Sequence, residues 1–236
     1  MSQAHPITQK WPAQFPERLQ LYSLPTPNGV KVSIMLEETD LLYEPHLVSF
    51  ATHEQMTPEF LSLSPNNKIP AILDPNPPGS GPGGQPLGLF ESGAILLYLA
   101  EKTGQLIPQD AAGRYETIQW VFWQVGGVGP MFGQLGFFYK FAGKDYEDKR
   151  PRDRYVAESK RLLNVLNQRL ATRTWVMGDA YTIADIAIFP WVRGLLGFYE
   201  AGELVGIQDF PHVTRALAAF VARPAVVRGL AIPAHV

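Results

Sequence analysis

The chain has 236 residues, and its 46% hydrophobic and 18% charged residues are an ordinary balance for a globular protein of one large or two modest domains. Its formal net charge of -2 provides no basic footprint, so we expect no nucleic-acid partner. No run of 18 apolar residues occurs, because even residues 183–192 contain Asp185 and Pro190, and we expect no membrane span.

The chain contains no cysteine. This excludes a structural disulfide, a thiolate metal site and a thiol nucleophile carried by the protein itself. Any thiol chemistry must therefore come from a ligand. The five histidines are scattered along the sequence, so we also expect no metal site.

Residues 1–18 hold polar residues and three prolines but no apolar signal-peptide core. We expect an N-terminal extension, either disordered or strapped onto the body. The missing signal core favours a cytoplasmic location.

Residues 19–106 alternate between strand-like and helix-like segments. Residues 19–22 alternate as a strand does and end at Pro25 and Pro27, and the helical pattern that follows puts Val32 and Met35 on one face. Further strands are expected at 44–48, 71–73 and 87–90, and further helices at 58–61 and 92–102. The order βαβαββα predicts a small mixed sheet with flanking helices.

From about residue 114 onward the sequence shows helical periodicity and no convincing strand. Helices are expected at residues 115–141, 152–170, 183–199, 213–222 and 226–230. Proline or glycine separates them, as in a helical bundle. The pattern changes near residues 106–113, so we expect a first domain at 19–106 and an all-helical second domain at 107–236. Gly126, Gly127 and Gly129 should kink the first of these helices.

Asn67, Lys68, Ile69 and Pro70 precede the strand at 71–73. A proline entering a strand lacks one ladder donor and can adopt the cis form, which would leave the Ile69 backbone able to pair with an extended peptide. The alternative is an ordinary turn before a strand, with Pro70 in a structural role only.

Glu91 and Ser92 open the helix at 92–102. Ser92 is a natural N-cap, a carboxylate is stabilised at a helix N-terminus, and Glu91 could bind an ammonium group. Such a site suits the amino-acid end of a peptide, for example a γ-glutamyl group. Simple capping beside an exposed glutamate remains the alternative.

Thr182 and Asp185 have the spacing of a capping box, with aspartate in the third place. We assign Asp185 to structure, because this box begins an apolar helix.

Residues 65–72 (Pro-Asn-Asn-Lys-Ile-Pro-Ala-Ile) and 89–99, which begin Leu-Phe-Glu-Ser-Gly, resemble glutathione transferases. Residues 25–29 (Pro-Thr-Pro-Asn-Gly) and 120–127 (Trp-Val-Phe-Trp-Gln-Val-Gly-Gly) are similar to the nu class, which includes bacterial disulfide-bond reductases and fungal Ure2-like relatives. The resemblance covers roughly residues 19–230. It implies a thioredoxin-like N-terminal domain, a helical-bundle C-terminal domain, and a homodimer with glutathione near the subunit boundary.

The resemblance also implies that the Thr26 hydroxyl and the Asn28 amide bond to the glutathione sulfur. Tyr22 lies within the strand, and the turn offers Thr26 and Asn28 instead. A free thiol has a pKa of ~8.5, and donors aimed at the thiolate lower it. Thr26 could instead be an N-cap with Pro27 at the first helical position, and both roles can hold together.

Further glutathione contacts are implied for Gln55, Lys68, Ile69, Glu91, Ser92 and Arg154. The implied activity is glutathione-dependent reduction of a small-molecule disulfide, with glutathione as the substrate that supplies the thiols. Two alternatives stay open: conjugation of glutathione to an electrophile, and a non-catalytic glutathione-binding regulator.

Overall fold

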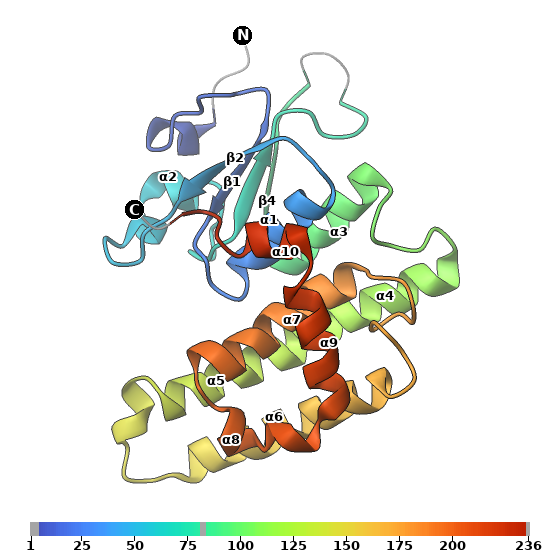
Figure 1. The fold of residues 1–236 in the computed structure, drawn as a ribbon. Coiled ribbons are helices and arrows are strands. Elements are labelled where there is room, and N and C mark those ends of the chain that lie inside the picture. Colours follow the sequence, from blue (N-terminus) through green and yellow to red (C-terminus); the bar gives the residue numbers. More distant parts are fainter. Residues whose placement is uncertain (1–4, 81–83, 235–236) are drawn as a thin grey trace. The chain divides into compact units, whose positions relative to one another are not determined.

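The computed structural model describes residues 5–80 and 84–234. The chain forms two compact units: one contains the described residues up to Gln105 together with those from Pro224 onward, and the other spans Leu106–Arg223. Figure 1 shows the helices and strands of both units.

The first unit is built on a four-stranded sheet in the order β2-β1-β3-β4. Strand β1 (Leu19–Ser23) is parallel to β2 (Tyr43–Leu47) and antiparallel to β3 (Ala71–Asp74), which is antiparallel to β4 (Leu87–Phe90). The helices are α1 (Gly29–Glu38), α2 (Pro58–Leu61) and α3 (Ser92–Thr103), with the short turn η2 (Glu54–Met56) before α2. This thioredoxin-like arrangement confirms the predicted order βαβαββα.

The two faces of the sheet are covered by different segments. Tyr22 and Ala71 belong to an apolar cluster with Phe60 of α2 and with Ile7 and Trp11 of the N-terminal extension. Successive side chains of a strand point to opposite faces, so their neighbours on β1 and β3 point the other way, where α1 and α3 contact the sheet.

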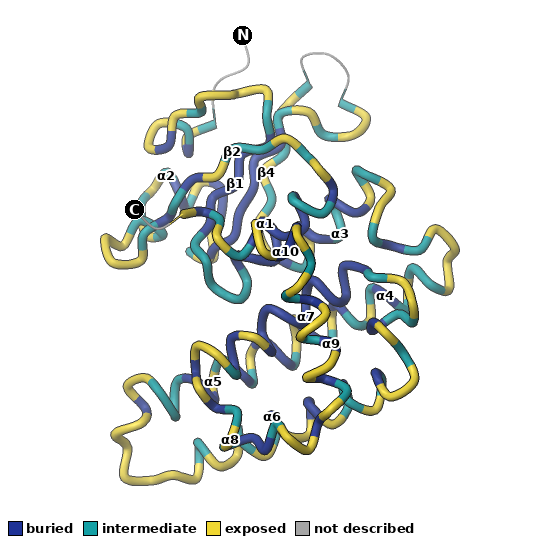
Figure 2. Tube along the Cα trace, in the orientation of Figure 1, coloured by how far each residue is buried: buried dark blue, intermediate teal, exposed yellow. Residues whose placement is uncertain are grey.

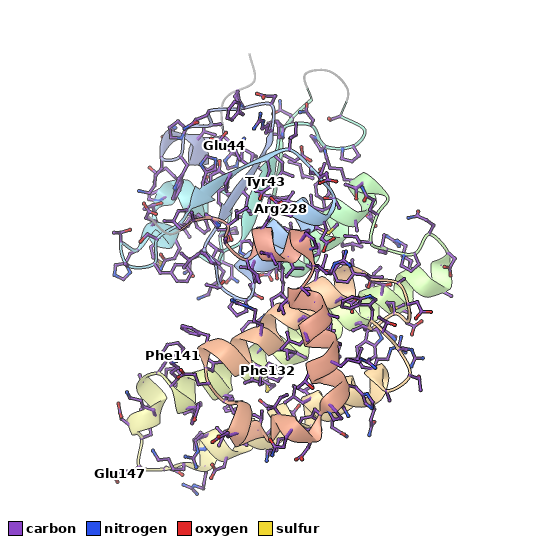
Figure 3. The ribbon with its side chains drawn as sticks, in the orientation of Figure 1. Tyr43, Glu44, Phe132, Phe141, Glu147 and Arg228 are labelled. Atoms are coloured by element: carbon purple, nitrogen blue, oxygen red, sulfur yellow. The ribbon has the colours of Figure 1, made fainter. Side chains whose placement is uncertain are left out.

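The described part of the N-terminal extension is strapped onto the first unit. Its turn η1 (Pro6–Gln9) contacts α2, and the Trp11 indole Nε1 donates to the Leu47 carbonyl at 3.0 Å. The backbone N–H groups of Gln14 and Phe15 donate to the Glu44 carboxylate, labelled in Figure 3, at 2.9 and 2.8 Å. Residues 1–4 of the extension lie outside the described residues.

Helix α10 (Pro224–Gly229) packs on α1, so the C-terminal segment groups with the first unit and not with the helical bundle. This differs from the expected second domain at 107–236. The reason is that every residue of α1 from Gly29 to Leu36 is buried (Figure 2). The sheet can bury only one side of this helix, so a second element must pack against the other side. Gly229 allows the close approach of α10 to α1, because a Cβ added at this position would lie only 2.6 Å from the Ile34 Cα.

Side-chain bonds hold α10 in place. The Ser33 hydroxyl donates to the Gly229 carbonyl at 2.6 Å. Arg228 of α10 and Tyr43 of β2, both labelled in Figure 3, donate to the same carboxylate, that of Glu37 on α1.

The second unit is helical, and no strand occurs among its described residues. Its helices are α4 (Ala111–Trp123), α5 (Gly129–Tyr139), α6 (Arg150–Leu170), α7 (Ile183–Arg193), α8 (Gly202–Val205) and α9 (Pro211–Val221). The short turns η4 (Ala142–Asp145) and η6 (Ile207–Asp209) link some of them. No helix in the described ranges is long and apolar enough to cross a membrane.

The glycines at 126, 127 and 129 mark a π-helical turn, η3 (Gln124–Val128), between α4 and α5. A second π-helical turn, η5 (Gly194–Phe198), follows α7. At Gly129 an added Cβ would lie 3.4 Å from the Trp191 ring and 2.9 Å from the Gln124 amide, so this glycine lets α5 approach α7. At Gly126 no atom would lie within 4 Å.

Helix α7 begins at a complete capping box. The Asp185 carboxylate accepts hydrogen bonds from the backbone N–H groups of Thr182 and Val176, each at 2.9 Å, and its side chain is fully buried. Burial raises the pKa of Asp185 to about 7, although these hydrogen bonds act to lower it. Asp185 thus ties the start of α7 to the loop before it.

Candidate functional site

The glutathione contacts expected in the first unit gather at one edge of the sheet. Because β1 and β2 are parallel to each other and β3 is antiparallel to β1 and β4, the C-terminal ends of β1, β2 and β4 meet the start of β3 at this edge (Figure 1). The residues that flank these strand ends are Thr26 and Asn28 after β1, Gln55 after β2, Lys68 and Ile69 before β3, and Glu91 and Ser92 after β4.

The Ile69–Pro70 peptide bond is cis, as the sequence predicted. The Lys68 side chain is exposed, and its carbonyl accepts a hydrogen bond from Ser64 Oγ at 2.8 Å. Within the described ranges the Ile69 N–H and C=O have no backbone partner, while the Ile69 side chain is buried. The main chain of Ile69 can therefore pair with an extended peptide.

Thr26 lies in the turn between β1 and α1. Its hydroxyl oxygen accepts a hydrogen bond from the Gly29 N–H at 3.2 Å, and its carbonyl accepts one from the Val30 N–H at 3.0 Å. Helix α1 itself begins at Gly29, so Asn28 and not Thr26 occupies the N-cap position, without a side-chain cap bond. Thr26 still satisfies a backbone donor at the helix start, and this bond does not consume its hydroxyl hydrogen.

Lys31 joins two of the expected site residues, and sequence reasoning missed it. Its side chain is 1% exposed, and its Nζ donates to Asn28 Oδ1 at 2.8 Å and to Ser92 Oγ at 3.2 Å. Burial lowers the pKa of Lys31 to about 7, and the charge of Glu91 acts in the opposite direction. A lysine on a helix is usually exposed to solvent, so its burial was not expected. Its contact with Asn28 could have been inferred from the spacing, because residues three apart lie on the same helix face.

Helix α3 begins at Ser92, and Glu91 occupies its N-cap position without a side-chain cap bond. The prediction that Ser92 is the N-cap is therefore wrong. Ser92 is already the first helical residue, and its hydroxyl oxygen accepts from the buried Lys31 ammonium. Glu91 has a φ of 71°, a left-handed conformation that is costly for a non-glycine residue and that concentrates at functional sites. Its exposed carboxylate accepts a bond from Asn66 Nδ2 at 3.5 Å.

The acceptor atoms of this site are engaged by donors of the protein itself. The Gly29 N–H binds the Thr26 oxygen, and Lys31 binds the side-chain oxygens of Asn28 and Ser92. The side-chain hydrogens of these residues are thereby directed away from their protein donors. The N-termini of α1 and α3 add positive potential. This arrangement fits a ligand with two anionic groups, such as a thiolate and a carboxylate.

Three further residues have distinct environments. Gln55 is half-buried, and its Oε1 is a buried acceptor that lacks a hydrogen-bond partner within the described residues. Arg154 is exposed on α6 in the second unit, so its glutathione contact stays a prediction. Tyr22 is fully buried and stacks on His46 with ring centroids 4.7 Å apart, and burial raises its pKa. Tyr22 is therefore part of the core and does not reach the turn.

No group of three or more aspartate, glutamate or histidine side chains that could hold a metal ion occurs in the described ranges.

Among curated proteins, the disulfide-bond oxidoreductase YfcG of Escherichia coli (strain K12) is 51% identical over 175 residues, which cover 74% of this chain and 79% of the relative. The disulfide-bond oxidoreductase YghU of the same organism is 44% identical over 221 residues, which cover 89% of this chain and 73% of the relative.

A solved glutathione transferase from Burkholderia graminis, with two glutathione molecules per subunit, is 78% identical to this chain at a TM-score of 0.94. The match covers 98% of this chain and 95% of the solved chain. One from Pseudomonas putida, with one glutathione disulfide per subunit, is 68% identical at a TM-score of 0.93 and covers 97% of each chain. Residues 17–101 match the model of the glutathione S-transferase N-terminal domain, and residues 129–224 match that of the C-terminal domain. The chain therefore belongs to the glutathione transferase family.

Proposed function

We propose that this protein is a glutathione-dependent disulfide-bond reductase of the nu class, in which bound glutathione supplies the reacting thiols. The observation that carries the proposal is the pair of side chains at the β1–α1 turn, Thr26 and Asn28, whose oxygens accept from the Gly29 N–H and from Lys31 Nζ, in a chain without cysteine. It is supported by the two relatives named disulfide-bond oxidoreductases, and by the solved structures that hold two glutathione molecules or glutathione disulfide.

The reaction consists of two thiol–disulfide exchanges. The thiolate of the first glutathione attacks one sulfur of the substrate disulfide, whose S–S bond breaks and releases one thiolate that takes a proton from water. The second glutathione thiolate attacks the glutathione sulfur of the mixed disulfide and releases the second thiolate. Two glutathione molecules are thereby oxidised to one glutathione disulfide, and the substrate is reduced to two thiols.

The protein contributes to this reaction by raising the thiolate fraction and by holding the peptide. The Thr26 hydroxyl and the Asn28 amide donate to the sulfur, which lowers the thiol pKa. The Ile69 backbone pairs with the cysteinyl unit as an added strand does. Glu91 and Ser92 bind the γ-glutamyl ammonium and carboxylate, while Gln55, Lys68 and Arg154 bind the remainder of the peptide.

Replacing Ser92 with alanine should raise the KM for glutathione about tenfold or more and lower kcat much less, because Ser92 binds the end of the substrate that does not react. Steady-state kinetics with glutathione as the varied substrate measure this. A variant in which kcat falls while KM is unchanged would show that Ser92 does not act in binding.

The protein should be a homodimer located in the cytoplasm, as the family resemblance suggests. Light scattering should give a mass of twice 26.2 kDa at working concentration. A stable species of single-chain mass would count against this assembly.

A bound glutathione thiolate could also attack an electrophile, so the proposed reaction needs a direct comparison. Turnover should be measured with a model dialkyl disulfide and with a model aryl halide at the same glutathione concentration. We expect the disulfide to be the better substrate by kcat/KM. Preference for the aryl halide would identify a conjugating transferase, and binding of glutathione without turnover of either would identify a regulator.

A further inference from the structure

Lys31 is a buried lysine that packing does not explain. Its side chain is 1% exposed on α1. A buried ammonium group is costly unless it is well paired, and a methionine of similar size would fill this part of the helix surface without that cost. Its neighbours are the residues assigned to the two ends of the same substrate: Asn28 at the sulfur and Ser92 at the γ-glutamyl group.

The chemistry of the lysine decides how these neighbours are oriented. An ammonium group has three donors and no acceptor, so it must meet Asn28 through the amide oxygen and Ser92 through a hydroxyl lone pair. The observed contacts are of this kind, Nζ to Oδ1 at 2.8 Å and Nζ to Oγ at 3.2 Å. The Asn28 Nδ2 group and the Ser92 hydroxyl hydrogen are thus turned away from the lysine.

We propose that Lys31 is a positioning residue, which presents the Asn28 amide to the glutathione sulfur and the Ser92 hydroxyl to the γ-glutamyl carboxylate. The inference rests on the proposed function and adds to it a residue that touches neither the thiol nor the carboxylate itself. One buried side chain thereby couples thiol activation to recognition of the far end of the tripeptide.

The charges around Lys31 suit this role. Glu91, at the start of α3, is the carboxylate that favours the charged form of Lys31. Other charged groups on α1 and on the elements that contact it stand at the C-terminal ends of α1, α3 and α10: Glu37, Glu38, Glu101, Lys102 and Arg228. Of these, Lys102 pairs with Asp74. At the N-terminal ends of α1 and α3, the charged groups are therefore the Lys31 ammonium and the Glu91 carboxylate.

The first test is Lys31→Met, which removes the donors but keeps the length of the side chain. We expect the KM for glutathione to rise about tenfold and the thiol pKa of bound glutathione to rise by about one unit. The matched control is Ser33→Ala on the same helix, because Ser33 is also buried but bonds to Gly229 on the other side of α1. This control should keep the wild-type KM and thiol pKa.

Double-mutant cycles separate positioning from a general loss of structure. If Lys31 acts through its two neighbours, Lys31→Met should change the thiol pKa much less in an Asn28→Ala background, and change KM much less in a Ser92→Ala background. Additive effects in both cycles would overturn the inference. So would a folded Lys31→Met protein with the wild-type KM and thiol pKa.

Should Lys31→Met fail to fold, the wild-type protein provides the test. The pKa of Lys31 can be measured by NMR in protein labelled with ¹³C-lysine. Glutathione should raise this pKa more than S-methylglutathione does, because only glutathione can form a thiolate. If the charge of Lys31 favours the thiolate, the thiolate must favour the charged form of Lys31 by the same free energy. Equal titration with both ligands would overturn the inference. Wild-type protein without disulfide turnover overturns the proposed function itself, whereas a wild-type-like Lys31→Met variant of an active enzyme overturns only the role of Lys31.

Discussion

Replacing Asp185 with alanine should lower the melting temperature by roughly 10 °C, as expected when two buried backbone donors lose their acceptor. The Asp185 carboxylate accepts from the Thr182 and Val176 N–H groups and has no solvent exposure. Each unsatisfied buried donor costs about 1–3 kcal/mol, so the pair amounts to roughly 2–6 kcal/mol. Thermal unfolding followed by circular dichroism measures the change.

The control for this variant is Asp179→Ala. Asp179 is exposed in the loop before α7 and accepts a bond from the Thr174 hydroxyl at 3.3 Å. Its removal should change the stability by less than about 0.5 kcal/mol. An Asp185→Ala protein that melts together with the wild type would show that the capping box contributes little to the second unit.

Replacing Thr26 with alanine should lower kcat/KM for disulfide reduction tenfold or more. A hydrogen bond to a charged group contributes roughly 1.5–3 kcal/mol, and each ~1.4 kcal/mol corresponds to a factor of ten in rate. Asn28→Ala should act in the same direction, and the two effects should be non-additive if both donors serve one sulfur, as we propose. Steady-state kinetics on the two single variants and the double variant measure these effects.

Thr26→Ser is the matched control, because it keeps the hydroxyl that accepts from the Gly29 N–H and that we propose as the donor to the sulfur. It should retain most of the activity. If Thr26→Ala and Asn28→Ala both keep full activity, Thr26 serves only the start of α1, and the sulfur must instead be held by backbone N–H groups, since Tyr22 is enclosed in the core.

Much of the first unit could be predicted because its information is local. The alternation at residues 19–22, the prolines that follow, and the glycine after α3 each determine the backbone within a few residues. The cis bond before Pro70 is also predicted from its immediate neighbours. The site edge follows from these elements, because the sheet order brings their ends together.

The features that were missed depend on contacts between distant parts of the chain. Helix α1 is buried from Gly29 to Leu36, since α10 returns nearly 200 residues later to cover its second side. This removes the amphipathic pattern that would distinguish a buried from an exposed Lys31. The contact between Lys31 and the Ser92 hydroxyl is also missed, because 61 residues separate the two partners in the sequence.

The central claim is that the protein lowers the pKa of a thiol that belongs to its substrate. The most direct measurement is the ultraviolet absorbance of the thiolate of bound glutathione, followed against pH in the wild-type protein, which has no cysteine of its own to interfere. We predict a pKa at least one unit below the ~8.5 typical of a free thiol. A bound thiol that titrates together with free glutathione would contradict the claim.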